Sequence, residues 1–369
     1  MASLPQGFPA KMEGPMAWDG PDYEDQPDLY TNVLSKDDLA EIHEAISHFK
    51  ATGLSRGHIN QQTFPLSERF SKRLNEVNSI LNDGKGFHVI RGIDPNQFTE
   101  EEHVLLFAGM ASHIADNRKA WIDHICNNKV VGPDEPPLRP TELAVPMDFH
   151  TDADAGNILA LFTENKGKAG GYQYLSSFWS VYNTIMEEDP SVMACLAADW
   201  HWEKPDRGQE GRVNQVMDRR AIVGHVNGKP EINYGRTFVA GSAEYPLSAD
   251  APRLTVDQIH ALDVLSTHAK RHAFRVHVES GDILLVNNLS ILHARTAFED
   301  SPAENLVRHV LRLWLKDNTS WPVASSLKYL ENSMWATTPE QMNILTLTEW
   351  NGTPRTERLT ETGTSCSHD

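Results

Sequence analysis

The segment His150-Thr151-Asp152 has the side-chain types and the spacing of a metal site. Side chains alternate between the two faces of a strand, so the imidazole of His150 and the carboxylate of Asp152 would lie on one face. Two histidines and one carboxylate form the facial triad that is typical of non-haem Fe(II) sites. The segment therefore predicts two of three metal ligands, and the third must come from elsewhere in the chain.

A His-x-Asp/Glu triplet is weak evidence by itself. Chance predicts about two such triplets in a chain with 17 His and 51 acidic residues among 369. The chain contains three, which begin at His150, His201 and His277. Their surroundings distinguish them, because only the first precedes an apolar strand and a Gly-Gly turn. His201-Trp202-Glu203 is typical of a surface or interface strand, and His277-Val278-Glu279 of a solvated strand end.

His293 is the candidate for the third ligand. It follows the segment 281–288, which reads as a strand that runs into a turn, and it lies on the returning strand. There His293 and Arg295 share one face, while Leu292 and Ala294 share the other. A single histidine on an apolar strand is commonly a hydrogen-bonded core residue, so this pattern alone leaves both interpretations open.

The segment 307–316 predicts a strand that carries two arginines on one face. Arg308 and Arg312 alternate with apolar residues in it. A guanidinium pairs with a carboxylate through two parallel hydrogen bonds, and a buried charge is costly unless it is paired. This face therefore predicts either a pair of arginines that binds a carboxylate (a carboxylate clamp) or the solvent-exposed side of an edge strand.

The elements that must position these residues are mostly short strands. Helical spacing of apolar residues predicts helices over 35–49, 65–82, 99–114, 179–188 and 255–271. Strands are predicted over 87–92, 157–163, 172–178, 219–226, 231–234, 274–278, 282–287, 291–298 and 307–316. Asn227-Gly228 is the turn of a hairpin. Many short strands separated by turns are typical of a sandwich or barrel, a class that includes jelly rolls.

Composition divides the chain into three parts. Residues 1–34 are rich in Pro, Gly and acids and predict an extended arm. Residues 35–320 predict a single catalytic domain with helical additions, and residues 321–369 a C-terminal helix and tail that could form a lid. Further lid segments are expected over 117–140, 206–218 and 335–347, because long loops at a barrel mouth are often functional.

The overall composition is that of a soluble globular protein, with 40% hydrophobic and 23% charged residues. A formal charge of −18 argues against a nucleic-acid partner or an anionic membrane. No apolar run approaches the ~20 residues of a transmembrane helix, and no secretory signal is evident. The three cysteines, at 126, 195 and 366, are too far apart to indicate a disulfide framework or a zinc knuckle. A cytoplasmic protein is the expectation.

Four motifs in order carry a family resemblance. They are Phe149-His-Thr-Asp152, Gly170-Gly-x-x-Tyr-Leu-x-Ser-x-Trp-x-Val-Tyr-Asn183, the segment 281–296, and Arg308-His-x-Leu-Arg-Leu-Trp-Leu315. Between Ile90 and Asp317 the chain resembles the Fe(II)/2-oxoglutarate-dependent oxygenases of the taurine-dioxygenase and clavaminate-synthase-like family. Within that family it most resembles the fungal members. The resemblance implies a mostly β fold with flanking helices and a double-stranded β-helix, or jelly-roll, core.

The same resemblance implies roles for individual residues. The iron ligands would be His150, Asp152 and His293. Arg308 would bind the far carboxylate of 2-oxoglutarate, and Arg312 would lie near the iron and contact the substrate or the keto acid. The segment between His293 and Arg308 is slightly longer than in the shortest family members, which leaves open a shift of this assignment by one arginine.

The chain departs from the family pattern after the Gly-Gly turn. Members commonly have Ser or Thr there as a second contact to 2-oxoglutarate, whereas this chain has Gln173, whose amide can donate the same hydrogen bond. Asp148 and Asp154 share the parity of Asp152. Asp154 is the stronger rival for the carboxylate ligand, although a solvated turn residue before Gly156 explains it as well.

The resemblance implies an enzyme that uses Fe(II), 2-oxoglutarate and O2. Such enzymes couple oxidative decarboxylation of 2-oxoglutarate to hydroxylation, desaturation or ring closure of a substrate. A small amino acid or amino-acid-derived metabolite of secondary metabolism is the expected substrate, with Arg312 or Arg295 as the anchor for its carboxylate. Two alternatives are a metal-binding jelly-roll protein without oxygenase activity and a zinc hydrolase that uses the same three residues.

Overall fold

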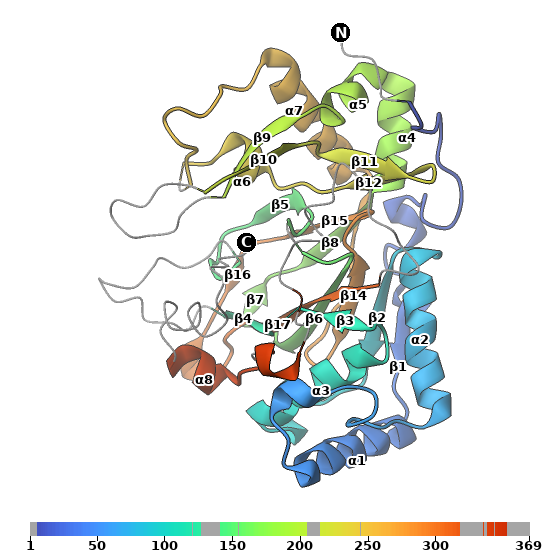
Figure 1. Cartoon of the computed structure of the whole chain (residues 1–369), viewed down its shortest axis with the longest axis vertical. Helices are drawn as coiled ribbons and strands as arrows, with labels where there is room; N and C mark the ends of the chain where they lie inside the picture. Colours follow the sequence, from blue (N-terminus) through green and yellow to red (C-terminus); the bar gives the residue numbers. More distant parts are fainter. Residues whose placement is uncertain are drawn as a thin grey trace.

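Two facing sheets form the centre of the molecule (Figure 1). The computed structural model describes residues 6–119, 121–126, 141–153, 155–204, 215–243, 245–317, 335, 338–342 and 344–352. The large sheet has the order β1 (Thr31–Val33), β2 (Phe87–Arg91), β14 (Ile283–Asn287), β6 (Ile158–Asn165), β17 (His309–Lys316) and β3 (Asn117–Arg118), and β4 (Asp123–Cys126) also pairs with β17. The small sheet has the order β13 (Ala273–Arg275), β8 (Gln173–Ser177), β15 (Ile291–Arg295) and β5 (Met147–His150). The predicted jelly-roll core is confirmed.

The large sheet is buried on both faces, which explains why β6 and β17 are apolar at nearly every position. Phe162 and Leu313 on its outer face pack with the helices of the N-terminal half. Leu159 and Trp314 on its inner face pack toward the small sheet. Period-two alternation therefore assigns each residue of these strands to one of two cores.

Three helices cover the outer face of the large sheet: α1 (Lys36–Thr52), α2 (Glu68–Asn82) and α3 (Glu100–Ser112). Their N-caps are Ser35, Ser67 and Thr99, whose side chains accept hydrogen bonds from backbone N–H groups of the first turn. The second helix begins after Ser67 and not at Pro65, because the hydroxyl of Ser67 satisfies the N–H of Phe70. All three predicted helices are confirmed.

The small sheet is covered by α4 (Phe178–Glu188), α5 (Pro190–Leu196) and α7 (Val256–Arg271). Two hairpins and a short helix lie beside them: β9 (Trp200–Lys204) with β10 (Gln215–Arg220), β11 (Val223–Val226) with β12 (Lys229–Ile232), and α6 (Arg236–Ala240). Pro190 opens α5 as its first residue, a position where proline costs no hydrogen bond.

Three local predictions were wrong. The predicted strand 219–226 divides into the end of β10 and β11, with residues 221 and 222 between them. Trp200 and Trp202 are fully buried, so the strand that carries His201 belongs to the core and not to a surface or interface. The predicted strand 291–298 divides into β15 and β16 (Phe298–Glu299), and β16 pairs with β7 (Ala169–Gly170). After β15 the chain leaves the small sheet. Thr296 and Tyr172 exchange hydrogen bonds at this point, and β16 then pairs with β7 at the Gly-Gly turn.

The described part of the N-terminal segment packs on the core. Met16 and Trp18 are buried, and their carbonyls accept hydrogen bonds from Ser177 and Ser180. Near the other end, α8 (Leu347–Gly352) is tied to Arg56 through Glu349. Single-turn 3-10 helices occur at Gly20–Asp22, Pro27–Leu29, Arg56–His58, Pro95–Gln97, Pro302–Glu304 and Pro339–Gln341. The boundaries of the three predicted parts stay a prediction.

The described residues contain no helix that is both long and apolar enough to cross a membrane. Of the expected lid segments 117–140, 206–218 and 335–347, residues 120, 127–140, 206–214, 336–337 and 343 lie outside the described residues, as do residues 321–334 and 353–369 of the predicted C-terminal helix and tail.

Candidate metal centre

His150, Asp152 and His293 converge where β5 and β15 pair. His150 and His293 are directly opposite in the antiparallel register, with ring centroids 4.2 Å apart. Oδ1 of Asp152 lies 3.9 Å from Nε2 of His150 and 3.5 Å from Nε2 of His293. One nitrogen or oxygen from each residue lies within 4.8 Å of the other two. In the part of the chain that the structure describes, this is the single group with metal-site geometry.

The carboxylate of Asp152 is held so that one oxygen stays open to the histidines. Its Oδ2 accepts hydrogen bonds from Nε1 of Trp314 at 2.7 Å and Nη1 of Arg312 at 3.3 Å. Asn288 fixes the backbone, because its side-chain oxygen accepts the Asp152 N–H and its amide donates to the Asp152 carbonyl, both at 2.9 Å. Burial opposes ionisation, but Arg312 and the two histidines hold the pKa of Asp152 well below its usual range.

His150 has the protonation state of a metal ligand. Its Nδ1–H donates to the carbonyl of Asp148 at 2.7 Å, which leaves the Nε2 lone pair facing Asp152 and His293. Burial and the neighbouring His293 lower the pKa of His150 to about 4, so the ring is neutral near pH 7. An ionised carboxylate between imidazole nitrogens matches the 2-His-1-carboxylate donor set of Fe(II), so these residues fit iron.

One pocket is lined by every residue that the sequence analysis assigned to the site. Apolar side chains of Ile125, Leu159, Leu161 and Val310 complete its wall. The assigned residues in its lining are His150, Asp152, Gln173, His293, Arg295, Arg308 and Arg312. The pocket thus lies between the two sheets. Its lining residues come from strands that are up to more than 150 positions apart in the sequence.

Arg308 is a buried cation that lines the pocket and whose guanidinium has no hydrogen-bond partner among the described residues. Its side chain is 7% exposed, and its guanidinium has no hydrogen bond or ion pair with a described residue. It lies over the ring of Phe298, 5.3 Å from the centroid, and Arg295 lies over the same ring at 4.8 Å. Burial and the adjacent Arg295 lower the pKa of Arg308 to about 9. A buried charge of this kind calls for an anionic ligand.

Glycines of the turn make room for Arg308. Gly171 has φ +66°, and a Cβ built there would lie 3.3 Å from Nε of Arg308. Gly167 has φ +81°, and its Cβ would lie 3.2 Å from Cβ of Arg308. Both the left-handed backbone and the close approach favour glycine. The Gly-Gly turn therefore supports the arginine as well as turning the chain.

The other two arginines have protein partners. Arg312 bridges Asp152 and Asp123, with a 2.7 Å contact from its Nη2 to Oδ2 of Asp123. Arg295 donates to the carbonyls of the loop before β5, those of Thr141 at 3.1 Å, Leu143 at 2.8 Å and Val145 at 2.6 Å. The geometry favours Arg308 over Arg312 as the carboxylate clamp. Substrate contacts of Arg312 and Arg295 stay predictions.

The two other His-x-Glu triplets have structural partners. Nε2 of His201 lies 2.8 Å from Oε1 of Glu203, whose second oxygen accepts the Ser248 N–H at 2.7 Å. His277 lies 3.4 Å from Asp25, and Glu279 pairs with Lys166. Asp148 is exposed and faces Lys270 at 3.4 Å. Asp154, the rival ligand, lies outside the described residues.

Three supporting residues were missed by the sequence analysis: Asp123, Asn288 and Trp314. Trp314 has the parity of Arg308 and Arg312 on its strand, so its direction toward the site was predictable. Asn288 stands at the end of a recognised motif, yet nothing in its type points to Asp152. Asp123 carries no local signal, because its partner Arg312 is 189 positions away.

The sequence model of one protein family matches most of the chain. This is the taurine catabolism dioxygenase TauD, TfdA family, and the match spans residues 49–314. The chain belongs to this family. It is an Fe(II)/2-oxoglutarate-dependent dioxygenase. This assignment removes the zinc hydrolase and the non-oxygenase binding protein as alternatives.

One curated relative is similar to the chain in sequence, and two solved structures share its fold. The taurine hydroxylase-like protein SAT17 of Stachybotrys chartarum is 28% identical over 329 residues, which are 86% of this chain and 83% of the relative. Asparagine oxygenase, solved with Fe(II), 2S,3S-3-hydroxyasparagine and succinate, has a TM-score of 0.56 at 14% identity, over 78% of this chain and 93% of its own.

The non-heme iron oxygenase OrfP, solved with Fe and alpha-ketoglutaric acid, has a TM-score of 0.57 at 14% identity, over 77% of this chain and 93% of its own. Another crystal of OrfP holds Fe, succinate and (3S)-hydroxy-L-Arg. At these identities the two solved structures show that this family member shares their fold.

Proposed function

We propose that His150, Asp152 and His293 bind Fe(II), and that Arg308 binds the far carboxylate of 2-oxoglutarate. The observation that carries the proposal is the convergence of a three-ligand group and an open, buried guanidinium in one pocket. The ligand group needs a metal and the guanidinium needs an anion. A metal-chelating dicarboxylate satisfies both requirements.

The remaining pocket residues hold these groups in place. Trp314 and Arg312 bind Oδ2 of Asp152, so Oδ1 faces the metal position. Gln173 lies opposite Arg295 in the register of β8 and β15 and lines the pocket with Arg308. We propose that its amide donates a second hydrogen bond to 2-oxoglutarate. When iron, 2-oxoglutarate and O2 are bound, they supply C–H oxidation, and apolar side chains such as Leu159 and Leu161 exclude water.

The proposed substrate is a small amino acid or an amino-acid-derived metabolite. The support is the chemistry of the proteins that share the fold, since asparagine oxygenase and OrfP were solved with a hydroxylated asparagine and a hydroxylated arginine. Hydroxylation is the simplest outcome, and the position of the target C–H bond decides between it, desaturation and ring closure. A role in secondary metabolism is part of this proposal.

An anaerobic titration tests the metal and cosubstrate assignments. Purified protein receives Fe(II) and then 2-oxoglutarate without oxygen, and a weak visible charge-transfer band is expected. Metal binding without any such band would contradict the oxygenase site.

A substrate panel tests the second half of the proposal. Succinate release in air is measured across the standard amino acids and a set of small carboxylic acids, and products are identified by a mass increase of one oxygen or a loss of two hydrogens. Coupled succinate release with an amino acid supports the proposed class. Stimulation by simple carboxylic acids alone would overturn it.

A further inference from the structure

The strand that carries His150 is held to its own sheet at few positions. β5 is an edge strand in the order β13-β8-β15-β5, so only β15 pairs with it among the described residues. That pairing matches His293 with His150 and Arg295 with Met147, and the register shifts between these two positions. β5 ends at His150, so Asp152 lies two positions beyond the sheet. Contacts from outside the sheet must therefore place the two ligands of this segment.

Tyr234 supplies such a contact through its backbone. Its carbonyl accepts the N–H of Thr151 at 2.7 Å, and its N–H donates to Oγ1 of Thr151 at 2.8 Å. Thr151 is 1% exposed and Tyr234 is 2% exposed, so water does not compete for these hydrogen bonds. The next N–H of the segment, that of Asp152, donates to Asn288 at 2.9 Å. Tyr234 and Asn288 thus hold two consecutive N–H groups beyond the end of β5.

Thr151 stands between two candidate ligands but does not share their direction. His150 and Asp152 line the metal pocket, whereas Thr151 is not among its lining residues. Alternation of side chains along an extended segment explains this difference. A hydroxyl that is held on the far side fixes the rotation of the chain, and the rotation sets the direction of both flanking side chains. Loss of this hydroxyl would also leave the N–H of Tyr234 buried without an acceptor.

The side chain of Tyr234 is linked to α7 through Arg236. Burial raises the pKa of Tyr234 to about 12, and the nearby charge of Arg236 acts in the opposite direction. Nη2 of Arg236 lies 2.8 Å from Oδ1 of Asp263 on α7. Seven positions further along α7, Lys270 lies 3.4 Å from Asp148 of β5. Seven residues are about two helical turns, so both contacts come from one face of α7.

The buried pair should outweigh the ionic contacts of α7. The four charged side chains in those contacts are between 39% and 73% exposed. Ion pairs between exposed side chains contribute little, because solvent screens them and ordering the side chains costs entropy. The placement of the ligands should therefore depend on the hydrogen bonds of Thr151 and hardly on these ion pairs.

We propose that Thr151 and Tyr234 are positioning residues of the metal centre, and that their reciprocal hydrogen bonds set the direction of His150 and Asp152. Neither residue lines the metal pocket, so both act through the ligands. This role rests on the proposed ligand set, since it explains how two of those ligands are held. Tyr234 is 83 positions from Thr151, and its backbone contact carries no signal in the sequence.

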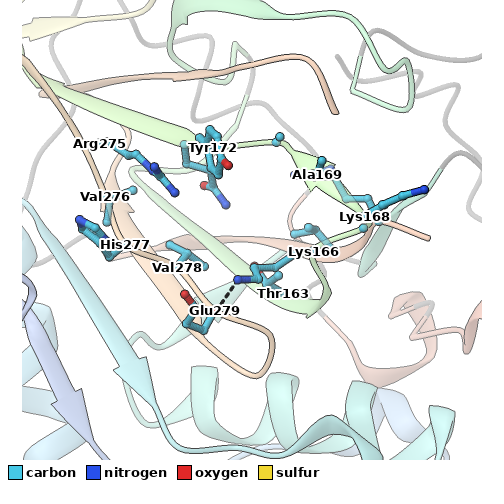
Figure 2. A pocket seen from close by; sticks show the side chains of 16 residues that line it. Thr163, Lys166, Lys168, Ala169, Tyr172, Arg275, Val276, His277, Val278 and Glu279 are labelled. Atoms are coloured by element: carbon cyan, nitrogen blue, oxygen red, sulfur yellow. Dashed lines mark hydrogen bonds and ion pairs between the residues drawn. The ribbon is translucent and has the colours of Figure 1, made fainter. Parts of the chain in front are cut away.

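The opposite edge of the small sheet offers a matched control. β13 ends at Arg275, which lies over the ring of Tyr172, 3.6 Å from its centroid (Figure 2). The cavity that these two residues line contains none of the three candidate metal ligands. Arg275→Gln therefore removes an interaction from the other edge strand of the same sheet without reaching the metal centre.

Metal titration of the metal-free protein tests the proposal. Co(II) is added without oxygen to wild type, Thr151→Val, Thr151→Ser and Arg275→Gln, and the visible absorption reports both the Kd and the coordination geometry. Thr151→Val should raise the Kd about tenfold and change the band shape, because a methyl group of similar size replaces the acceptor hydroxyl. Thr151→Ser keeps the hydroxyl and should restore most of the affinity. Arg275→Gln should match wild type.

A second ligand separates positioning from a general loss of structure. The Kd of 2-oxoglutarate is measured at saturating Co(II), and Thr151→Val should change it little, because Arg308 belongs to the other sheet. Weaker binding of both ligands would show a loosened pocket and would overturn the positioning role. Circular dichroism and a thermal melt verify folding. If Thr151→Val does not fold, Thr151→Ala takes its place with the same expectation.

The remaining outcomes separate this role from the proposed function. Equal Co(II) affinity and spectra in wild type and Thr151→Val would overturn the positioning role and leave the ligand set standing. An equal loss in Thr151→Ser would also overturn it, since the hydroxyl would not be the cause. Tyr234→Phe keeps the backbone contacts and should bind Co(II) like wild type; a tenfold loss there would contradict the backbone as the cause. Absence of Co(II) binding by wild type would overturn the ligand set and the positioning role together.

Discussion

Both faces of β17 and its neighbouring strands bury ionisable side chains. On the outer face these side chains are hydrogen-bonded to one another and to backbone carbonyls, whereas on the inner face some have no protein partner. On the outer face, Glu164 pairs with two histidines. Its Oε2 contacts Nδ1 of His309, and its Oε1 lies 2.8 Å from Nδ1 of His103. His309 then contacts His124 at 3.0 Å, and His124 contacts the carbonyl of Leu345 at 2.8 Å. The far nitrogen of His103 donates to the carbonyl of Pro95 at 2.9 Å. The chain of hydrogen bonds runs from α3 to the segment before α8.

The inner face is left incomplete. Arg312 is paired, but the guanidinium of Arg308 and the carboxylate of Asp152 line the open metal pocket. A buried polar group that has its partners stabilises a fold, whereas one without partners costs free energy unless a ligand supplies them. The same strands therefore hold a structural network on one side and a binding site on the other. Substitutions on the two faces should separate these roles.

The largest expected effect is that of Asp152→Ala. Loss of the carboxylate removes one ligand and the acceptor of Trp314 and Arg312, and turnover should fall about a thousandfold. The anaerobic charge-transfer band should be lost as well. Asp148→Ala is the matched control, because that exposed carboxylate is two positions away and its retained carbonyl still accepts from His150. An equal loss in both variants would contradict the assigned ligand.

Next in size is the contrast between Arg308→Ala and Arg312→Ala. The first should raise the Kd of 2-oxoglutarate about 100-fold with iron binding retained, since it removes one partner of a buried charge pair. The second should lower iron affinity about 10- to 100-fold, because Arg312 orients Asp152. Binding of each ligand is measured by titration on the same preparations. The opposite ranking would show that the clamp is shifted by one arginine.

Glu164→Gln tests the outer face. The variant removes the charge that two histidines share and should lower the free energy of unfolding by about 2 kcal/mol. The Kd of 2-oxoglutarate should stay unchanged, because Glu164 lies on the far side of the sheet. Urea unfolding measures the free energy of unfolding, and anaerobic titration measures the Kd of 2-oxoglutarate. A large change in 2-oxoglutarate affinity would mean that the two faces are coupled.

The pH dependence of stability follows from the same network. Burial and the neighbouring His309 lower the pKa of His124 to about 4, so between pH 6.5 and 4 the unfolded chain binds more protons than the folded one. Stability should therefore fall as the pH falls through this range. His124→Gln should flatten the profile of unfolding midpoint against pH. An unchanged slope would show that other groups dominate the acid response.

Glu164 acts in the same direction at lower pH. Burial opposes its ionisation, but His103 and His309 lower the pKa of Glu164 to about 2. Its contribution is complete above about pH 4.5 and is lost as the pH falls toward 2. The difference in stability between wild type and Glu164→Gln should shrink over that lower range.

The smallest expected effect is that of Gln173→Ala. One neutral hydrogen bond to 2-oxoglutarate is worth about 1 kcal/mol, so the KM for 2-oxoglutarate should rise about fivefold with kcat nearly unchanged. Gln173→Thr, which restores the commoner residue of the family, should return most of the affinity. An unchanged KM for 2-oxoglutarate in Gln173→Ala would remove Gln173 from the cosubstrate site.

Local patterns predicted most of the elements around the site. The alternation of 307–316 placed Arg308 and Arg312 on one face, and both line the metal pocket from β17. Helical spacing and capping residues predicted the helices that cover the large sheet. Predictions failed where a distant partner decides the outcome. Trp200 and Trp202 are buried by residues that their own segment does not reveal, and the break after β15 depends on pairing with the Gly-Gly turn.

The sequence by itself determined the family, because four motifs in order carry the resemblance, and the resemblance in turn implied the jelly-roll core and the candidate ligands. Only the tertiary structure decided which arginine is open. Arg308 and Arg312 have the same type, the same strand and the same face, but Asp152 and Asp123 occupy one of them and leave the other unpaired. Partners brought together across 160 and 189 positions set that difference, and no local pattern encodes such contacts.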